Sequence, residues 1–161
     1  MAKAYTTKGD EGFTRDFLGK TYLKDDLIIV TNGKMDSLQS ALDMALFLDS
    51  KHSDFLKMVQ KKLWQTCGEI ANCPIGSLNA PITDLDLKQL EEYIDSLGEP
   101  PNKFVRFNNE TSIWFNECRV RCRELELSLV KMFRDGKVRS EVYRYINRLS
   151  SLFFMLGYTS S

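Results

Sequence analysis

Apolar residues recur every three or four positions along most of this chain, which is the spacing of one face of an α-helix. The pattern predicts a first helix over residues 27–48. Its apolar positions include Met35, Leu38, Leu42, Ala45 and Leu46. A second helix is expected to begin at Ser53 and Asp54, which can cap it, and to end before Pro74, because proline breaks a helix interior.

Proline, glycine and capping residues mark three more helices. All four prolines lie in one central region, so the long segments on either side are free to be helical. Thr83, followed by Asp86 three residues later, predicts a capping box at the start of a third helix, which Gly98 ends. A fourth helix is expected over residues 111–133 and a fifth over residues 140–158.

Short connections between long amphipathic helices imply antiparallel neighbours. We therefore predict an all-α, up-and-down five-helix bundle of the ferritin-like kind. Strand-like alternation is weak and confined to residues 103–107. The first 25 residues are rich in Gly, Thr and Lys and lack helical periodicity. One domain over residues 1–161 is expected, with an arm (1–25) ahead of a helical bundle (26–161).

Composition and charge narrow the classes of function. Lysine plus arginine and aspartate plus glutamate number 22 each, so no net basic field attracts nucleic acid or an anionic membrane. No apolar run approaches the roughly 18 residues of a membrane-spanning helix, and the first residues lack the apolar core of a signal peptide. A chain of this length can fold without disulfide bonds, so its four cysteines are expected to be reduced thiols and the protein is expected to be cytoplasmic.

The arm contains a glycine-rich loop with lysines around it. The loop reads Thr6-Thr7-Lys8-Gly9-Asp10-Glu11-Gly12-Phe13-Thr14, and Lys24 follows it. Glycines let backbone N–H groups converge on an anion, hydroxyls add donors and lysines add charge, which makes the loop a candidate polyphosphate cradle. The same pattern is common in ordinary turns, so alone it leaves both interpretations open.

Polar residues also mark the fourth and fifth helices. Arg119, Arg123 and Glu126 lie at i, i+4 and i+7, hence on one stripe beside the apolar face. An exposed salt-bridged face is the simpler interpretation of this stripe, and an anion site is the alternative. Asn147 and Arg148 occupy a mostly apolar helix, where a buried polar pair needs partners.

The cysteines and the single histidine give no metal-site pattern. Cys118 and Cys122 lie four residues apart, but their spacing to Cys67 and Cys73 is not that of a zinc site. We expect small buried hydrophobes there and predict no metal ligands. His52, between two predicted helices, is expected at the surface.

Taken together and in this order, the motifs resemble the PduO-type ATP:cob(I)alamin adenosyltransferases across the whole chain. The segments that carry the resemblance are Lys8-Gly9-Asp10-Glu11-Gly12, Lys24-Asp25-Asp26, Gly33-Lys34-Met35-Asp36-Ser37-Leu38-Gln39-Ser40, the stripe of Arg119, Arg123 and Glu126, and Tyr145-Ile146-Asn147-Arg148-Leu149-Ser150. The resemblance implies a homotrimer whose active sites lie between neighbouring subunits.

The implied reaction transfers the 5′-deoxyadenosyl group of ATP to cob(I)alamin, with Mg²⁺, giving adenosylcobalamin and triphosphate. The resemblance assigns catalysis to Lys24, Arg123 and Glu126. The implied ATP-binding residues are Thr6, Thr7, Lys8, Gly9, Asp10, Thr14, Lys24, Arg123, Glu126 and Asn147. On the cobalamin side it places Asp36, Phe104 and Arg119, with Asp36 and Arg119 as a pair. A corrinoid reductase and an adenosylcobalamin-dependent enzyme would be the partner proteins.

The chain departs from the family pattern at several positions. Glu124 and Leu127 stand where the family has arginines, Ser151 replaces an aspartate, Asn108-Asn109 replaces a Pro-Gly-Gly turn, and Lys8 and Arg15 replace small hydroxyl residues. Charge-assisted hydrogen bonds contribute about 1.5–3 kcal/mol each, so two missing arginines weaken a triphosphate site. The alternative function is therefore a degenerate, non-catalytic bundle that binds a corrinoid or a nucleotide.

Overall fold

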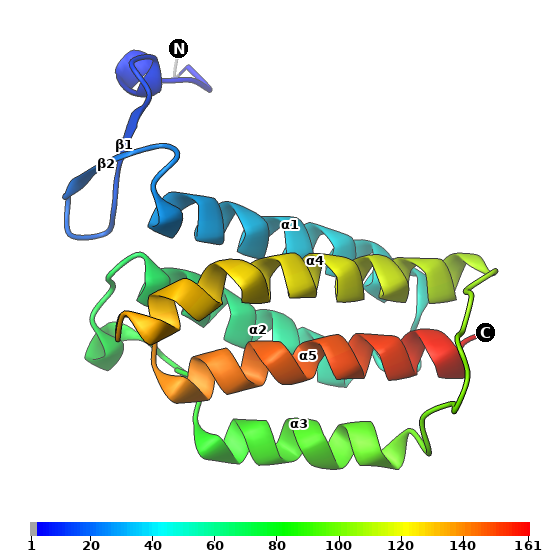
Figure 1. The fold of residues 1–161 in the computed structure, drawn as a ribbon. Coiled ribbons are helices and arrows are strands. Elements are labelled where there is room, and N and C mark those ends of the chain that lie inside the picture. The colour runs from blue at the N-terminus through cyan, green and yellow to red at the C-terminus, as the bar shows by residue number, and fades with distance from the viewer. Residues whose placement is uncertain (1–2) are drawn as a thin grey trace.

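The computed structural model describes residues 3–161, and within them an up-and-down bundle of five α-helices follows a short N-terminal arm (Figure 1). The helices are α1 (Leu27–Leu48), α2 (Ser53–Ile70), α3 (Asp84–Ser96), α4 (Glu110–Arg134) and α5 (Ser140–Thr159). The predicted all-α five-helix bundle is confirmed, and the first helix has the predicted bounds. Among the described helices, none combines the length and apolar character that crossing a bilayer requires.

The arm contains a two-stranded antiparallel hairpin that the sequence pattern did not reveal. β1 (Phe13–Arg15) pairs with β2 (Thr21–Leu23), and Thr14 lies opposite Tyr22. Strands of three residues are too short for alternation to be read from sequence. The segment 103–107, the one weak strand candidate, forms no strand. Short 3₁₀ turns, η1 (Thr7–Gly9) and η2 (Ile75–Ser77), complete the secondary structure of the described residues.

Local capping residues set several helix starts. Thr83 and Asp86 form the predicted capping box of α3, and Gly98 follows that helix with a left-handed φ of 103°. The predicted cap of α2 is wrong, because His52 precedes the helix without a side-chain cap bond and Ser53 already lies inside it. The sequence thus predicted the helix start correctly where two residues form a reciprocal capping box.

Asn109, one of the residues that replaces the family's turn, caps α4. Its side-chain oxygen accepts from Ser112 N at 2.9 Å, and Ser112 reciprocates to the Asn109 backbone. Its amide Nδ2 also donates to Ser160 O at 2.6 Å. The replacement therefore ties the start of α4 to the end of α5.

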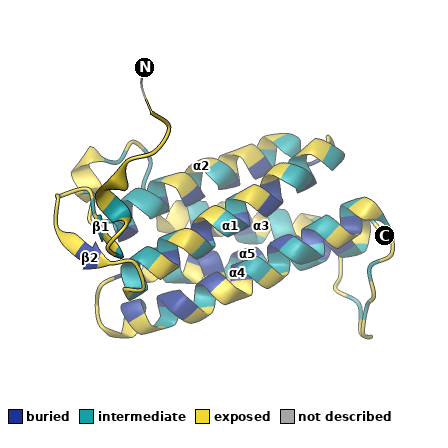
Figure 2. Cartoon of the chain, turned by 90° about the horizontal axis from the view of Figure 1, so that it is seen from above, coloured by how far each residue is buried: buried dark blue, intermediate teal, exposed yellow. Residues whose placement is uncertain are grey.

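The core lies between α4 and its neighbours. α4 packs against both α1 and α5, while α2 packs on α1 and α3 on α5, so the buried residues gather where helices face one another (Figure 2). Cys118 and Cys122 are fully buried in this core, as expected for small hydrophobes. Burial raises the pKa of the Cys118 thiol to about 12, and it raises that of Cys122 as well.

The expectation that His52 lies at the surface is wrong. The Asp49 carboxylate accepts from the His52 backbone N–H, which closes the turn between α1 and α2 and tucks the ring under α3. There His52 Nδ1 lies 2.7 Å from Tyr93 Oη, and Tyr93 stacks on Phe55. Desolvation lowers the pKa of His52, so the buried ring favours the neutral form.

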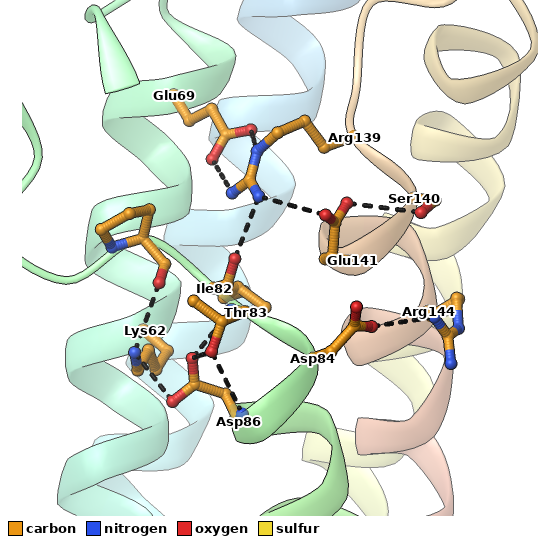
Figure 3. A network of polar contacts seen from close by, with 11 residues as sticks. Lys62, Glu69, Ile82, Thr83, Asp84, Asp86, Arg139, Ser140, Glu141 and Arg144 are labelled. Carbon is orange, nitrogen blue, oxygen red and sulfur yellow. Dashed lines mark hydrogen bonds and ion pairs between the residues drawn. The ribbon is translucent and has the colours of Figure 1, made fainter. Parts of the chain in front are cut away.

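Ion pairs join α2, α3 and the start of α5 (Figure 3). The Arg139 guanidinium donates two hydrogen bonds to the Glu69 carboxylate, from Nε to Oε1 at 2.7 Å and from Nη2 to Oε2 at 2.8 Å. Lys62 pairs with Asp86 at 2.9 Å. Desolvation raises the pKa of Asp86, but hydrogen bonds from Lys62 and Thr83 outweigh it, so this pKa lies below its ordinary value. These contacts fix α2 against the loop that enters α3.

Removing Glu69 should destabilise the bundle more than removing an exposed carboxylate of the same network. The Glu69 and Arg139 side chains are 13% and 28% exposed, whereas Asp84 and its partner Arg144 are 74% and 53% exposed. We expect Glu69→Ala to lower the free energy of unfolding by about 1–3 kcal/mol, because it leaves a half-buried guanidinium short of partners. Asp84→Ala should cost less than about 1 kcal/mol. Urea denaturation of both variants measures this, and equal losses would contradict it.

Candidate functional site

The glycine-rich loop and the hairpin line an open cavity of about 800 Å³ in the arm, which lies at the end of the bundle where α1 begins (Figure 1). Its lining residues are Thr6, Lys8, Gly9, Asp10, Phe13, Thr14, Arg15, Thr21 and Lys24. Every arm residue predicted to bind ATP is among them except Thr7, which starts the adjoining 3₁₀ turn. The structure therefore gathers this part of the predicted site in one place.

A backbone hydrogen bond holds Lys24, one of the three cationic residues of the cavity, over the glycine-rich loop. Lys24 N donates to Gly12 O at 2.8 Å, and Gly12 has a left-handed φ of 82°. A Cβ at Gly9 would lie 2.8 Å from Lys24 Nζ, so a glycine is needed there for the ammonium to sit where it does. Three cationic side chains and several hydroxyls converge here, which suits a polyphosphate.

Arg15, Thr21 and Phe13 are cavity residues that the sequence prediction left out of the site. Arg15 and Thr21 are cross-strand partners, which is why they reach the same wall. The sequence signal for Arg15 was its cationic side chain at a position where the family has a small hydroxyl residue. Recognising it as a cavity residue required the hairpin register.

A second cavity, of about 420 Å³, lies between α3, α4 and α5. Its lining residues are Ile94, Asp95, Gly98, Pro100, Arg119, Arg123, Ser150, Ser151, Phe154 and Met155. Arg119 Nε donates to Asn116 Oδ1 at 2.9 Å, and the Arg123 side chain is exposed. In residues 3–161 neither arginine has a carboxylate within ion-pair distance, so the salt-bridged interpretation of this stripe is wrong.

Arg121, which lies between Arg119 and Arg123 on α4, does form an ion pair. It pairs with Glu117 at 2.8 Å and donates to Ser37 of α1. Arg121 therefore faces α1, away from the cavity that contains Arg123.

A third cavity, of about 520 Å³, adjoins the second and shares Arg119 and Phe154 with it. Phe104, Phe107 and Ile113 give it an apolar wall, and Phe104 is 86% exposed. Lys103, Arg106, Asn116 and Arg119 line the rest of it. An exposed aromatic side chain on an apolar wall with a polar rim suits a large planar ligand that carries polar substituents.

The remaining predicted residues lie elsewhere in the chain. Asp36 lines a groove of about 630 Å³ between α1 and α2, so a single chain does not bring it to Arg119. Asn147 is exposed rather than embedded in the apolar face, and Glu126 is half-buried; neither lines a cavity described above. Arg148 pairs with Glu91 at 2.9 Å, which supplies the partner its position required.

Fold and cavities together define a class: an all-α bundle protein that carries a cation-lined cavity in its N-terminal arm and, on its fourth helix, two arginines that line a second cavity.

Comparisons with known proteins agree with this class. The family model for cobalamin adenosyltransferase matches residues 4–160. A corrinoid adenosyltransferase of Citrobacter freundii is 32% identical over 98% of this chain and 94% of its own length. The bovine corrinoid adenosyltransferase MMAB is 28% identical over 98% of this chain and 70% of its own. The chain belongs to the cobalamin adenosyltransferase family.

Solved structures show the same fold. A variant PduO-type ATP:corrinoid adenosyltransferase from Lactobacillus reuteri, complexed with cobalamin and ATP, matches with a TM-score of 0.85. It is 24% identical, and the match covers 98% of this chain and 90% of that one. A second variant of that enzyme, complexed with ATP, matches with a TM-score of 0.82 at 26% identity over 97% of this chain and 95% of its own.

Proposed function

We propose that the chain transfers the 5′-deoxyadenosyl group of ATP to cob(I)alamin, giving adenosylcobalamin and triphosphate, with residues 1–161 acting as one domain. The observation that carries the proposal is the arm cavity, where Lys8, Arg15 and Lys24 converge beside a glycine loop. Family membership supports it, as do the ATP and cobalamin held by the Lactobacillus reuteri structure.

The reaction explains why cations are needed. The cobalt(I) electron pair of the corrinoid attacks C5′ of ATP, the Co–C bond forms, and the C5′–O bond breaks. The cobalt is oxidised to cobalt(III), and triphosphate leaves with the bonding electron pair. Negative charge grows on the leaving group, so Lys24 and Arg123 stabilise the transition state if both reach the triphosphate. Glu126 and Asn147 complete the nucleotide contacts in this proposal.

The arm cavity fits a metal–nucleotide complex rather than a free metal ion. Its lining includes one carboxylate, Asp10, among three cations, so the triphosphate oxygens supply most ligands for Mg²⁺. When bound, Mg²⁺ adds positive charge at the leaving group. Asp10 is the residue of this chain that we assign to hold it, directly or through water.

The corrinoid side uses the third cavity. The exposed Phe104 and its apolar neighbours offer a wall against one face of the corrin ring, which would shield that face from water once the corrinoid is bound. An apolar wall disfavours an axial water or base on the cobalt, which makes reduction of cob(II)alamin easier. We assign Arg119 to the rim of this cavity.

We place each complete active site between two copies of the chain. The arm cavity and the cavity of Arg119 and Arg123 share no residue, and Asp36 lies in a groove apart from both. An arm from one subunit and α4 from the next would unite ATP with Arg123, and the same contact would pair Asp36 with Arg119. A closed homotrimer satisfies this heterologous arrangement.

The outward side of α4 offers a surface for that assembly. Ile113, Val120 and Leu127 recur every seven residues along it and are all exposed. We expect the protein to sediment as a trimer at micromolar concentration, and Val120→Glu to shift it towards monomers. Leu85→Glu adds the same charge at an exposed apolar position on α3 and should leave the trimer intact. A stable wild-type monomer, or equal behaviour of the two variants, would contradict the shared site.

Cellular context follows from the chemistry. The four cysteines are free, which fits a reducing cytoplasm. A reductase that delivers cob(I)alamin and an enzyme that uses adenosylcobalamin are the partner classes that the reaction requires.

An anaerobic assay tests the function. Chemically reduced cob(I)alamin, ATP and Mg²⁺ are mixed with the protein, the corrinoid spectrum is followed, and triphosphate is quantified. We expect adenosylcobalamin and triphosphate in equal amounts. Calorimetric binding of ATP or corrinoid without any product would instead establish the degenerate, non-catalytic bundle.

A further inference from the structure

Apart from its direct chain connection into α1, the arm is hydrogen-bonded to the bundle at the carboxyl end of α2. Asn72 Nδ2 donates to Asp16 Oδ2 at 2.9 Å and to Tyr22 Oη at 3.1 Å. Phe17 N donates to Ala71 O at 3.3 Å. Where the arm continues into α1, Asp26 N donates to Leu23 O at 3.0 Å. Away from that chain connection, the bonds to Ala71 and Asn72 are the hydrogen bonds that join the arm to the bundle in the described part of the chain. The contact of the hairpin with the end of α2 therefore depends on these two adjacent residues.

Asn72 has the backbone conformation that this contact needs. Its φ of 64° is left-handed, which asparagine tolerates better than most residues and which ends α2. Cys73 N donates back to Gly68 O at 2.8 Å, so the turn is closed. The turn is built into the helix end and holds the Asn72 side chain against the hairpin.

Asp16 joins this contact to the hairpin turn. Its Oδ1 accepts from Leu18 N and Lys20 N at 2.9 Å each, and its Oδ2 accepts from Tyr22 Oη at 3.0 Å. Desolvation raises the pKa of Asp16, but the hydrogen bonds, that from Asn72 first among them, hold this pKa below its ordinary value. The carboxylate is thus ionised at neutral pH, when it accepts all four bonds.

The anchoring residues are direct neighbours of the cavity wall. Arg15 precedes Asp16, Thr21 precedes Tyr22, and Thr14 lies opposite Tyr22 across the hairpin. A shift of the hairpin therefore moves three lining residues together. A cavity that is in place before the ligand arrives loses less conformational freedom on binding.

We propose that Asn72, through Asp16 and Tyr22, is a positioning residue that holds the arm cavity in its ATP-binding orientation on the bundle. The proposal rests on the proposed function in that it takes ATP as the ligand of this cavity. Asn72 lies outside the lining of the arm cavity, so it is not placed to contact ATP there. It raises the fraction of molecules whose cavity is in place, so its loss weakens ATP binding and leaves the reaction of bound ATP unchanged.

Asn72→Gly tests this directly, because glycine adopts a φ of 64° without strain and lacks the amide. We expect the KM for ATP to rise about tenfold, as for a tenfold loss of the competent fraction. The kcat and the KM for cob(I)alamin should stay within about twofold of wild type. Without nucleotide, hydrogen exchange of the amides of residues 13–23 should be about tenfold faster. Asn79→Gly, in an exposed loop, is the matched control.

If Asn72→Gly lowers the melting temperature, Tyr22→Phe provides a second test. Tyr22 lies in β2, outside the helices, and this substitution removes the hydroxyl that bonds to Asp16 and Asn72. Unchanged exchange of the hairpin in either folded variant overturns the anchor. A lower kcat with an unchanged KM for ATP overturns the positioning role. If the wild type binds ATP but transfers no adenosyl group, the proposed function fails alone, and the dissociation constant for ATP then takes the place of the KM.

Discussion

Arg123→Ala should lower kcat about 100- to 1,000-fold, the loss seen when a preorganised contact to developing charge is removed. Arg123 is exposed, lines the cavity between α3, α4 and α5, and has no carboxylate partner among the described residues. Its charge is therefore free for a leaving triphosphate. The measurement is single-turnover formation of adenosylcobalamin with saturating ATP, made on variants whose sedimentation matches that of the wild type.

Lys88→Ala is the control for the loss of one positive charge. Lys88 is exposed on α3, pairs at 3.8 Å with Glu92 of its own helix, and lines no cavity described above. Its rate should match that of the wild type. Arg121→Ala is a poorer control, because Arg121 links α4 to Ser37 of α1. Similar rates for Arg123→Ala and Lys88→Ala would remove Arg123 from the mechanism and favour the degenerate bundle.

Lys24→Ala should lower kcat/KM for ATP about 10- to 150-fold, which corresponds to one lost charge-assisted contact of about 1.5–3 kcal/mol. The Lys24 ammonium lies over Gly9 inside the arm cavity. Gly9→Ala places a methyl group against this ammonium and should move it, giving a smaller loss in the same direction.

Lys3→Ala is the matched control for this series. Lys3 belongs to the same arm, carries the same charge and lies over the ring of Tyr5 outside the cavity. Initial rates across an ATP titration compare all three variants. Equal losses for Lys3→Ala and Lys24→Ala would mean that the arm acts through its general charge, and the cavity would no longer be the ATP site.

The sequence correctly predicted those features of the fold that depend on interactions between residues close together in the chain. Thr83 and Asp86 cap α3 as expected, because a capping box is complete within four residues. The spacing of apolar residues predicted the bounds of α1 correctly, because the helix buries one apolar face along its length. The family prediction is also confirmed, because it rested on motifs spread along the whole chain.

What the sequence did not predict depends on contacts between distant segments. The burial of His52 follows from its contact with Tyr93, 41 residues later. The hairpin was missed because its strands are too short to show alternation, and its contact with the end of α2 depends on Asn72, 56 residues from Asp16. Asp36 and Arg119 line separate cavities of one chain, so the pairing that the family resemblance implies stays a prediction about two neighbouring chains.

The charge of this protein is balanced overall, yet its arm cavity concentrates three cations. At physiological ionic strength such a local field reaches only about 8 Å. Long polyanions such as RNA need a row of cations along an extended surface, whereas these three cations gather around one cavity. In the proposed function, a compact triphosphate would meet these charges together. Gathering the charge in one cavity would then let a protein of balanced net charge favour a small anion over large ones.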